Sequence, residues 1–148
     1  ILKVTENHRV FFKRLIEECK IDIIWANHPH VAKIFEQTES GKFIMYANGN
    51  TISAQRTNPQ FSAPETPRDF TGEGLIIKLK ASKNADGSII LSDIEPHLIT
   101  TYITPSWQFV VKELNEDFIN ALDKAEIVNW AKYLTERKKI MERELSGK

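Results

Sequence analysis

The sequence predicts an α/β fold, and three observations support this prediction. An amphipathic helix pattern near the start leads directly into a short apolar strand, an order typical of α/β folds with parallel sheets. Strand patterns fill the middle of the chain, and helix patterns return at its end. The length of 148 residues suits one domain, and 41% hydrophobic with 27% charged residues is typical of globular proteins.

Composition also excludes several classes of protein. Lys and Arg total 20 and Asp and Glu total 20, so a net charge of zero gives no reason to expect nucleic acid as a partner. The longest uninterrupted apolar run, residues 43–47, is far shorter than the ~20 residues of a membrane span. The one cysteine, Cys19, cannot form a disulfide within the chain, and its place on an apolar stripe predicts a core residue.

The first helix is predicted over residues 5–19. Thr5 supplies an N-cap, and apolar residues return every three or four positions from Val10 to Cys19. The mainly apolar segment that follows, residues 21–26, predicts a short buried strand.

Strands are predicted where apolar and polar residues alternate, or where short apolar runs lie between turn residues. Their ranges are 31–37, 42–47, 75–82, 88–94, 98–103 and 107–114. Turn-forming residues at 39–41 and 84–87 join the first and the second pair of these strands. Two helices follow at 116–124 and 126–145.

The last helix, residues 126–145, is predicted to be amphipathic. Its apolar stripe consists of Ile127, Ala131, Leu134, Met141 and Leu145. Charges of both signs cover the rest, with Lys138–Glu142 and Glu144–Lys148 pairs at helical spacing. We therefore expect it to pack on the domain with a solvated outer face, and a partner-binding helix is the alternative.

A long loop, residues 48–70, shows neither helix nor strand periodicity. Loops of this length within compact domains tend to be functional or disordered. Arg56 and Arg68 lie in it and could bind a phosphate or a carboxylate, the alternative being that both are solvated.

The sharpest candidate site is His28-Pro29-His30, directly after the first predicted strand. Pro29 restricts the backbone, and two imidazoles at a strand end suit Zn, Mn or Fe. The alternative is that they are ordinary loop histidines, because the pattern lacks the carboxylates of a catalytic metal site.

A second candidate follows the strand at residues 42–47. The amides of Asn48 and Asn50 can coordinate or hydrogen-bond, and Gly49 permits close backbone approach. Ordinary turn chemistry is the alternative. If the two strands neighbour each other in one sheet, both candidates lie on the same rim.

Other chemically capable residues are given structural interpretations. His97 is interpreted as a surface or turn residue, and Cys19 as core rather than a nucleophile. Trp25, Trp107 and Trp130 are expected in the core rather than as stacking platforms.

Four segments together resemble the bacterial poly-γ-glutamate capsule biosynthesis protein family. They are residues 12–18, 21–25, 28–31 and 42–50, whose order and spacing follow the family pattern from about residue 11 to residue 51. Residues 71–94 are similar to the closing strands of the family.

The resemblance implies a fold and a site. The fold would be the C-terminal part of a metallophosphatase-like α/β sandwich with flanking helices, with residues 1–104 as the C-terminal half of that domain and residues 105–148 as an extension packed on it. His28 and His30 would be catalytic ligands of two divalent metal ions (Mn, Fe or Zn). The substrate-binding residues would be Asn48, Gly49, Asn50, Arg56 and Arg68, of which the two arginines match no family motif.

The earlier motifs of the family, including a Gly-Asp strand end, do not occur here. We therefore expect an N-terminal half to precede Ile1, to complete the sheet and to supply the remaining ligands. This fragment alone is expected to be inactive and without metal, and membrane association is expected only through upstream segments.

The function implied is biosynthesis or export of an anionic envelope polymer such as poly-γ-glutamate, at the cell envelope or extracellular face of a bacterium. The chemistry would be metal-dependent hydrolysis or transfer at a phosphoester or amide. The alternatives are a non-catalytic envelope module that binds or assembles polymer and keeps the fold, and a fragment that folds alone as a polymer-binding domain.

Overall fold

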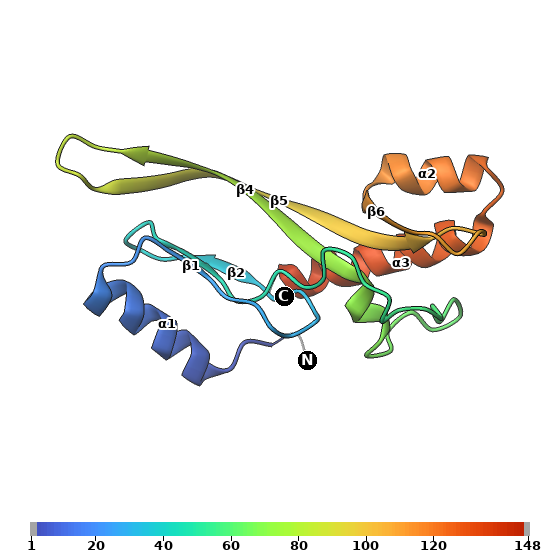
Figure 1. Cartoon of the computed structure of the whole chain (residues 1–148), viewed down its shortest axis with the longest axis horizontal. Helices are drawn as coiled ribbons and strands as arrows, with labels where there is room; N and C mark the ends of the chain where they lie inside the picture. Colours follow the sequence, from blue (N-terminus) through green and yellow to red (C-terminus); the bar gives the residue numbers. More distant parts are fainter. Residues whose placement is uncertain (1–2, 147–148) are drawn as a thin grey trace.

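The computed structural model describes residues 3–146. The helices are α1 (Glu6–Cys19), the 3-10 turn η1 (Asp69–Gly72), α2 (Glu116–Lys124) and α3 (Val128–Leu145). The strands are β1 (Ile23–Trp25), β2 (Phe35–Gln37), β3 (Phe43–Met45), β4 (Glu73–Lys83), β5 (Ile89–Ile103) and β6 (Phe109–Glu113). The predicted α/β class is confirmed, with the strands of the described residues forming two small sheets (Figure 1).

The first sheet has β3 at its centre, with β1 parallel and β2 antiparallel to it. Helix α1 packs on one face, where Ile16 meets Ile44 and Tyr46 (Figure 1). Its predicted N-cap is confirmed, since the Thr5 hydroxyl accepts a hydrogen bond from the backbone N–H of His8 at 3.4 Å.

Two residues expected in the core are exposed. Strand β1 was expected to be buried, yet Trp25 is 48% exposed, because β1 is an edge strand and α1 covers only the face of Ile24. Cys19 is also exposed, because it is the last residue of α1.

The second sheet is an antiparallel meander, β4-β5-β6, whose long β4–β5 hairpin extends away from α2 and over the first sheet (Figure 1). The predicted break between residues 94 and 98 is wrong, because β5 is continuous. Pro96 is tolerated because β6 pairs with β5 only from Ile99 onward, so β5 has a free edge at the proline. A bulge near Asp93, whose φ is 51°, shifts the register instead.

Helices α2 and α3 enclose a core with the second sheet, in which Leu122 and Leu134 pack around Tyr102. Further along α3, Met141 enters a second core that contains side chains of both sheets, including Phe43 and Leu75. Helix α3 therefore links the two sheets through its buried face.

The amphipathic pattern of α3 is confirmed with one correction. Its buried face includes Arg137, a charge that the predicted apolar stripe omits. The expected Lys138–Glu142 ion pair forms at 2.8 Å. The expected Glu144–Lys148 pair lies outside the described residues, because Lys148 is not among them.

The backbone after β3 joins the sheets. Gly49 forms an isolated bridge with Gly74 of β4, and Asn48 forms one with Ala32. A Cβ atom on Gly49 would lie 2.7 Å from the carbonyl oxygen of Glu73, so only glycine allows this approach.

None of the helices within residues 3–146 is long and apolar enough to span a membrane.

Candidate functional site

The carboxyl ends of β1 and β3 lie side by side, because the two strands pair in parallel. The backbone N–H of Ala26 continues this contact by donating to the carbonyl of Met45 at 2.8 Å. The predicted rim therefore exists as a place where residues 27–30 and 48–50 leave neighbouring strands.

The structure brings His30 and Asn50 together on this rim. Nδ1 of His30 lies 3.0 Å from Oδ1 of Asn50, and the Asn50 amide nitrogen donates to the His30 carbonyl at 3.2 Å. The same nitrogen donates to the carbonyl of Thr71 at 2.9 Å, in the segment that leads into the second sheet. Since Oδ1 can only accept, Nδ1 of His30 carries the proton, and the lone pair of the neutral ring is on Nε2.

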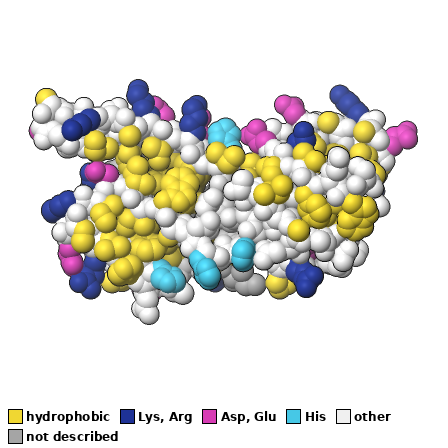
Figure 2. Space-filling view, viewed as in Figure 1, with side chains coloured by type: hydrophobic (Ala, Val, Ile, Leu, Met, Phe, Trp, Pro, Cys, Tyr) yellow, Lys and Arg dark blue, Asp and Glu magenta, His cyan; other side chains and the backbone are white. Residues whose placement is uncertain are grey.

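His28 is exposed and faces other neighbours. Its φ of 128° is rare for a non-glycine residue. It lines a pocket of about 270 Å³ with His8, Phe12 and Tyr46, and His30 is not part of that lining. Histidine side chains gather along the lower border of the face shown in Figure 2.

Within residues 3–146, no group of three or more His, Cys, Asp or Glu side chains is arranged to hold a metal ion. On this rim, His30 has the donor chemistry and the orienting hydrogen bond of a ligand. His28 supplies a second imidazole on the same loop.

Arg56 and Arg68, both predicted to bind substrate, occupy opposite environments. Arg68 is exposed before η1, where its carbonyl accepts a 2.7 Å hydrogen bond from the Thr71 hydroxyl. Arg56 is 1% exposed, which differs from the expected ligand-facing position, because protein groups already bind its guanidinium. It donates to the Thr100 hydroxyl at 2.8 Å and forms an ion pair with Glu73.

The buried ion cluster, Arg56, Glu73 and Arg137, connects the long loop, β4 and α3. Nη2 of Arg137 donates to Glu73 at 2.7 Å, and its Nη1 donates to the carbonyl of Pro64 at 2.6 Å. All three side chains are at most 1% exposed. The buried ion cluster requires the absence of a side chain at Gly72, because a Cβ atom there would lie 2.0 Å from the guanidinium carbon of Arg56.

A second buried carboxylate lies close by. Oδ1 of Asp69 accepts a 2.5 Å hydrogen bond from Tyr133 of α3, and Oδ2 accepts one from the backbone N–H of Thr66 at 2.9 Å. Burial raises the pKa of Tyr133 well above its usual range, so its hydroxyl remains a donor. These contacts hold the long loop in place rather than perform chemistry.

Sequence reasoning missed Asp69, Glu73 and Arg137. A signal for Arg137 was present, because position 137 lies three residues after Leu134 and four before Met141, on the same helical face. Glu73 and Asp69 carry no such pattern.

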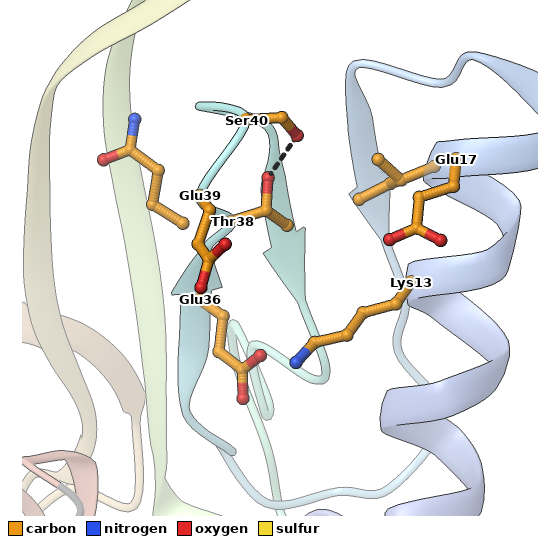
Figure 3. A pocket seen from close by; sticks show the side chains of 8 residues that line it. Lys13, Glu17, Glu36, Thr38, Glu39 and Ser40 are labelled. Carbon is orange, nitrogen blue, oxygen red and sulfur yellow. Dashed lines mark hydrogen bonds between the residues drawn. The ribbon is translucent and has the colours of Figure 1, made fainter.

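A pocket of about 450 Å³ lies between α1 and the β2–β3 hairpin. Lys13 and Glu17 of α1 face Glu36 and Glu39 across it (Figure 3). Glu36 is already paired with Arg9 and accepts from the Tyr46 hydroxyl at 3.3 Å. The lining of this pocket therefore carries Lys13 and three glutamates, of which Glu36 is paired with Arg9.

Comparison with known proteins gives one finding. Residues 1–55 match the family model described as bacterial capsule synthesis protein PGA_cap. Comparison with curated proteins and with solved structures yielded no match. The resemblance proposed from the sequence is confirmed over this segment, which contains His28, His30 and residues 48–50.

Proposed function

From the premise that residues 1–55 carry the pattern of bacterial capsule synthesis proteins, we propose that the intact protein makes or exports poly-γ-glutamate. Its place of action would be the cell envelope or extracellular face of a bacterium. Its chemistry would be metal-dependent hydrolysis or transfer at a phosphoester or amide, with an anionic polymer or a phosphoester as substrate.

The contact between His30 and Asn50 is the observation that supports the proposed metal site. A hydrogen bond to one ring nitrogen orients the imidazole and leaves the other nitrogen for a metal. His30 and His28 would hold two divalent ions (Mn, Fe or Zn) together with ligands from outside this chain. Such ions polarise a phosphoryl or carbonyl oxygen and activate water when bound.

The remaining ligands would come from an N-terminal half of the same domain. Strand β1 supports this proposal, because it pairs with β3 on one side and is the edge of its sheet. A further strand could add to the free edge and cover Ile23 and Trp25, which are 38% and 48% exposed.

Metal analysis of the full-length protein tests the proposal. We expect the H28A/H30A double variant to lose bound metal and phosphoesterase activity. The matched control is His97→Ala, which removes a histidine that hydrogen-bonds Glu113 at 3.1 Å in the second sheet. The control is expected to keep both properties.

Unchanged metal content in the double variant would exclude these histidines as ligands. Metal loss without any change in phosphoesterase activity would exclude metal-dependent chemistry at these histidines. Absence of metal and of hydrolysis in the unmodified full-length protein would favour the non-catalytic polymer-binding or assembly module.

A further inference from the structure

An aromatic pocket lies at the end of the molecule where the β5–β6 turn meets the long loop and the start of α3, and its lining contains no histidine. Its volume is about 360 Å³, within the ~300–1,000 Å³ range of small-molecule sites. Its walls come from the long loop, the β5–β6 turn and the start of α3, and hydrophobic side chains gather at this end in Figure 2. The lining residues are Thr57, Asn58, Pro59, Phe61, Ile103, Thr104, Pro105, Trp107 and Trp130.

Trp107 departs most from the sequence prediction of a core residue, because it is 67% exposed. Its φ of 60° places the backbone in the left-handed region, which is unfavourable for a non-glycine residue. The turn enforces this conformation: Trp107 N–H donates to Thr104 O, and Thr104 N–H donates to Gln108 O, both at 2.9 Å. A large aromatic ring held in solvent by a strained turn is a feature of binding sites rather than of cores.

The opposite wall is held in place by aromatic packing. The ring of Trp130 lies 5.1 Å from that of Tyr102 and 5.6 Å from that of Phe61, with near-perpendicular planes. Phe61 also packs edge-on against Tyr133 at 5.5 Å. These contacts fix the wall before any ligand arrives, which reduces the entropy that binding would cost.

The chemistry of the lining defines the ligand class. None of the lining residues is Lys, Arg, Asp or Glu, so a polyanion such as poly-γ-glutamate would find no countercharge. Aromatic faces accept apolar C–H surfaces, while Asn58 and Thr57 offer an amide and a hydroxyl group that pair with hydroxyls. A ring with apolar faces and a hydroxyl-rich edge satisfies both requirements.

We propose that this pocket binds a neutral saccharide, with a sugar ring stacked on Trp107 and its hydroxyls bonded to Asn58 and Thr57. The proposal is independent of the metal site and of poly-γ-glutamate. It gives the chain a carbohydrate-binding site separate from the histidine rim.

Titration of the full chain with neutral trisaccharides tests it, using maltotriose, cellotriose and triacetylchitotriose as probes. The three tryptophans give separate indole N–H signals in NMR spectra. We expect millimolar saccharide to shift the signals of Trp107 and Trp130 and to leave that of Trp25 in place. Tri-γ-glutamate and a proline-rich peptide serve as competing ligand classes.

Trp107→Ala should weaken saccharide binding about tenfold, which is the loss of one aromatic stacking contact. Trp107→Phe should recover part of that loss. The matched control is Trp25→Ala, which removes an exposed tryptophan on β1 and should leave affinity unchanged. An unchanged melting temperature for Trp107→Ala would show that the loss is not one of folding.

The proposal is overturned if none of the three saccharides shifts either indole signal, or if Trp107→Ala binds as tightly as the unchanged chain. If only the proline-rich peptide shifts these indole signals, the pocket is assigned to a protein partner. If only tri-γ-glutamate shifts them, the pocket is assigned to the polyanion. Either result would also overturn the saccharide proposal, independently of the outcome of the metal analysis.

Discussion

Asn50 orients the ring of His30, and this contact can be tested without any metal. In Asn50→Ala the acceptor for Nδ1–H is lost, so the ring should relax toward the tautomer mixture of a free imidazole. Loss of one hydrogen bond of about 1 kcal/mol changes the ratio of tautomers about fivefold. Nitrogen NMR of the histidine rings measures this ratio.

The His97 ring provides an internal control for that experiment, because its Nδ1 faces Glu113 at 3.1 Å and should not respond. Asn50→Asp keeps an acceptor at the same position and should keep the Nδ1–H form of His30. An unchanged His30 tautomer in Asn50→Ala would show that Asn50 does not set it.

Asp69 should make stability depend on acid pH. Burial raises the pKa of its carboxyl, but hydrogen bonds from Thr66, Tyr133 and Gln60 outweigh burial and hold the pKa below its usual value of ~3.9. The lowered pKa means that Asp69 stabilises the fold above about pH 4, and that this contribution is lost as the pH falls through the folded-state pKa.

Asp69→Asn isolates this effect. At about pH 7 the variant should be less stable by about 1–3 kcal/mol, and the gap should narrow at about pH 3. Urea unfolding of both proteins at the two pH values measures the free energy of unfolding. A gap that stays constant with pH would mean that the ionised carboxylate of Asp69 is not what matters.

Single residues were predicted from the sequence to very different degrees. Thr5 was identified as a cap because capping is local chemistry between residues three apart. The burial of Arg56 was not, because it depends on Glu73 and Thr100, which lie 17 and 44 residues away in the chain. No local pattern encodes such a contact.

At the level of elements, the bridge between the sheets at Gly49 should be intolerant of any side chain. Gly49 and Gly41 have nearly the same φ, 72° and 75°, so alanine costs about 1–2 kcal/mol of backbone strain at either position. At Gly49 a Cβ would also lie 2.7 Å from one backbone atom and 2.8 Å from another, whereas nothing lies within 4 Å of it at Gly41. Gly49→Ala should therefore be less stable than Gly41→Ala by about 1–3 kcal/mol.

Urea unfolding of both variants measures this difference, with Gly41→Ala as the matched control for strain alone. Equal losses of stability would show that the backbone near Glu73 yields to the added methyl group.

Most elements were predicted from their periodicity. Helix α2 was predicted with its observed bounds, because its apolar residues follow the helical period. The structure adds that Asn115 caps it. The break within β5 was predicted wrongly at Pro96, because the effect of a proline depends on whether its strand has a neighbour there. The sequence of a strand alone does not show which strands pair with it, or over which residues.

For the whole molecule, the buried ion cluster should contribute more to stability than any surface ion pair. Glu73→Gln removes the charge that neutralises two buried arginines and should cost about 3–5 kcal/mol. The matched control is Glu95→Gln, which breaks an exposed 2.9 Å pair with Lys78 and should cost less than about 1 kcal/mol. Chemical unfolding curves compare the two, and similar losses would contradict the assignment.

The shared rim was predicted on the condition that the two strands neighbour each other, and the parallel pairing of β1 with β3 meets that condition. The contact of His30 with Asn50 was not predicted. The separation into two sheets was not, because it depends on the short bridge at Gly49 and on α3 reaching both cores. The aromatic pocket could not be predicted either, since three distant segments form it.

The ion cluster also sets an order of events during folding. Arg137 follows Glu73 by 64 residues, so the carboxylate gains its second counterion only when α3 is in place. Until then, burial of Glu73 would carry a large desolvation penalty. The start of β4 is therefore expected to remain exposed to water until α3 packs. A ribosome must therefore release α3 before the long loop can adopt its final conformation, and a chain that stops before Val128 would lose order in residues 48–70.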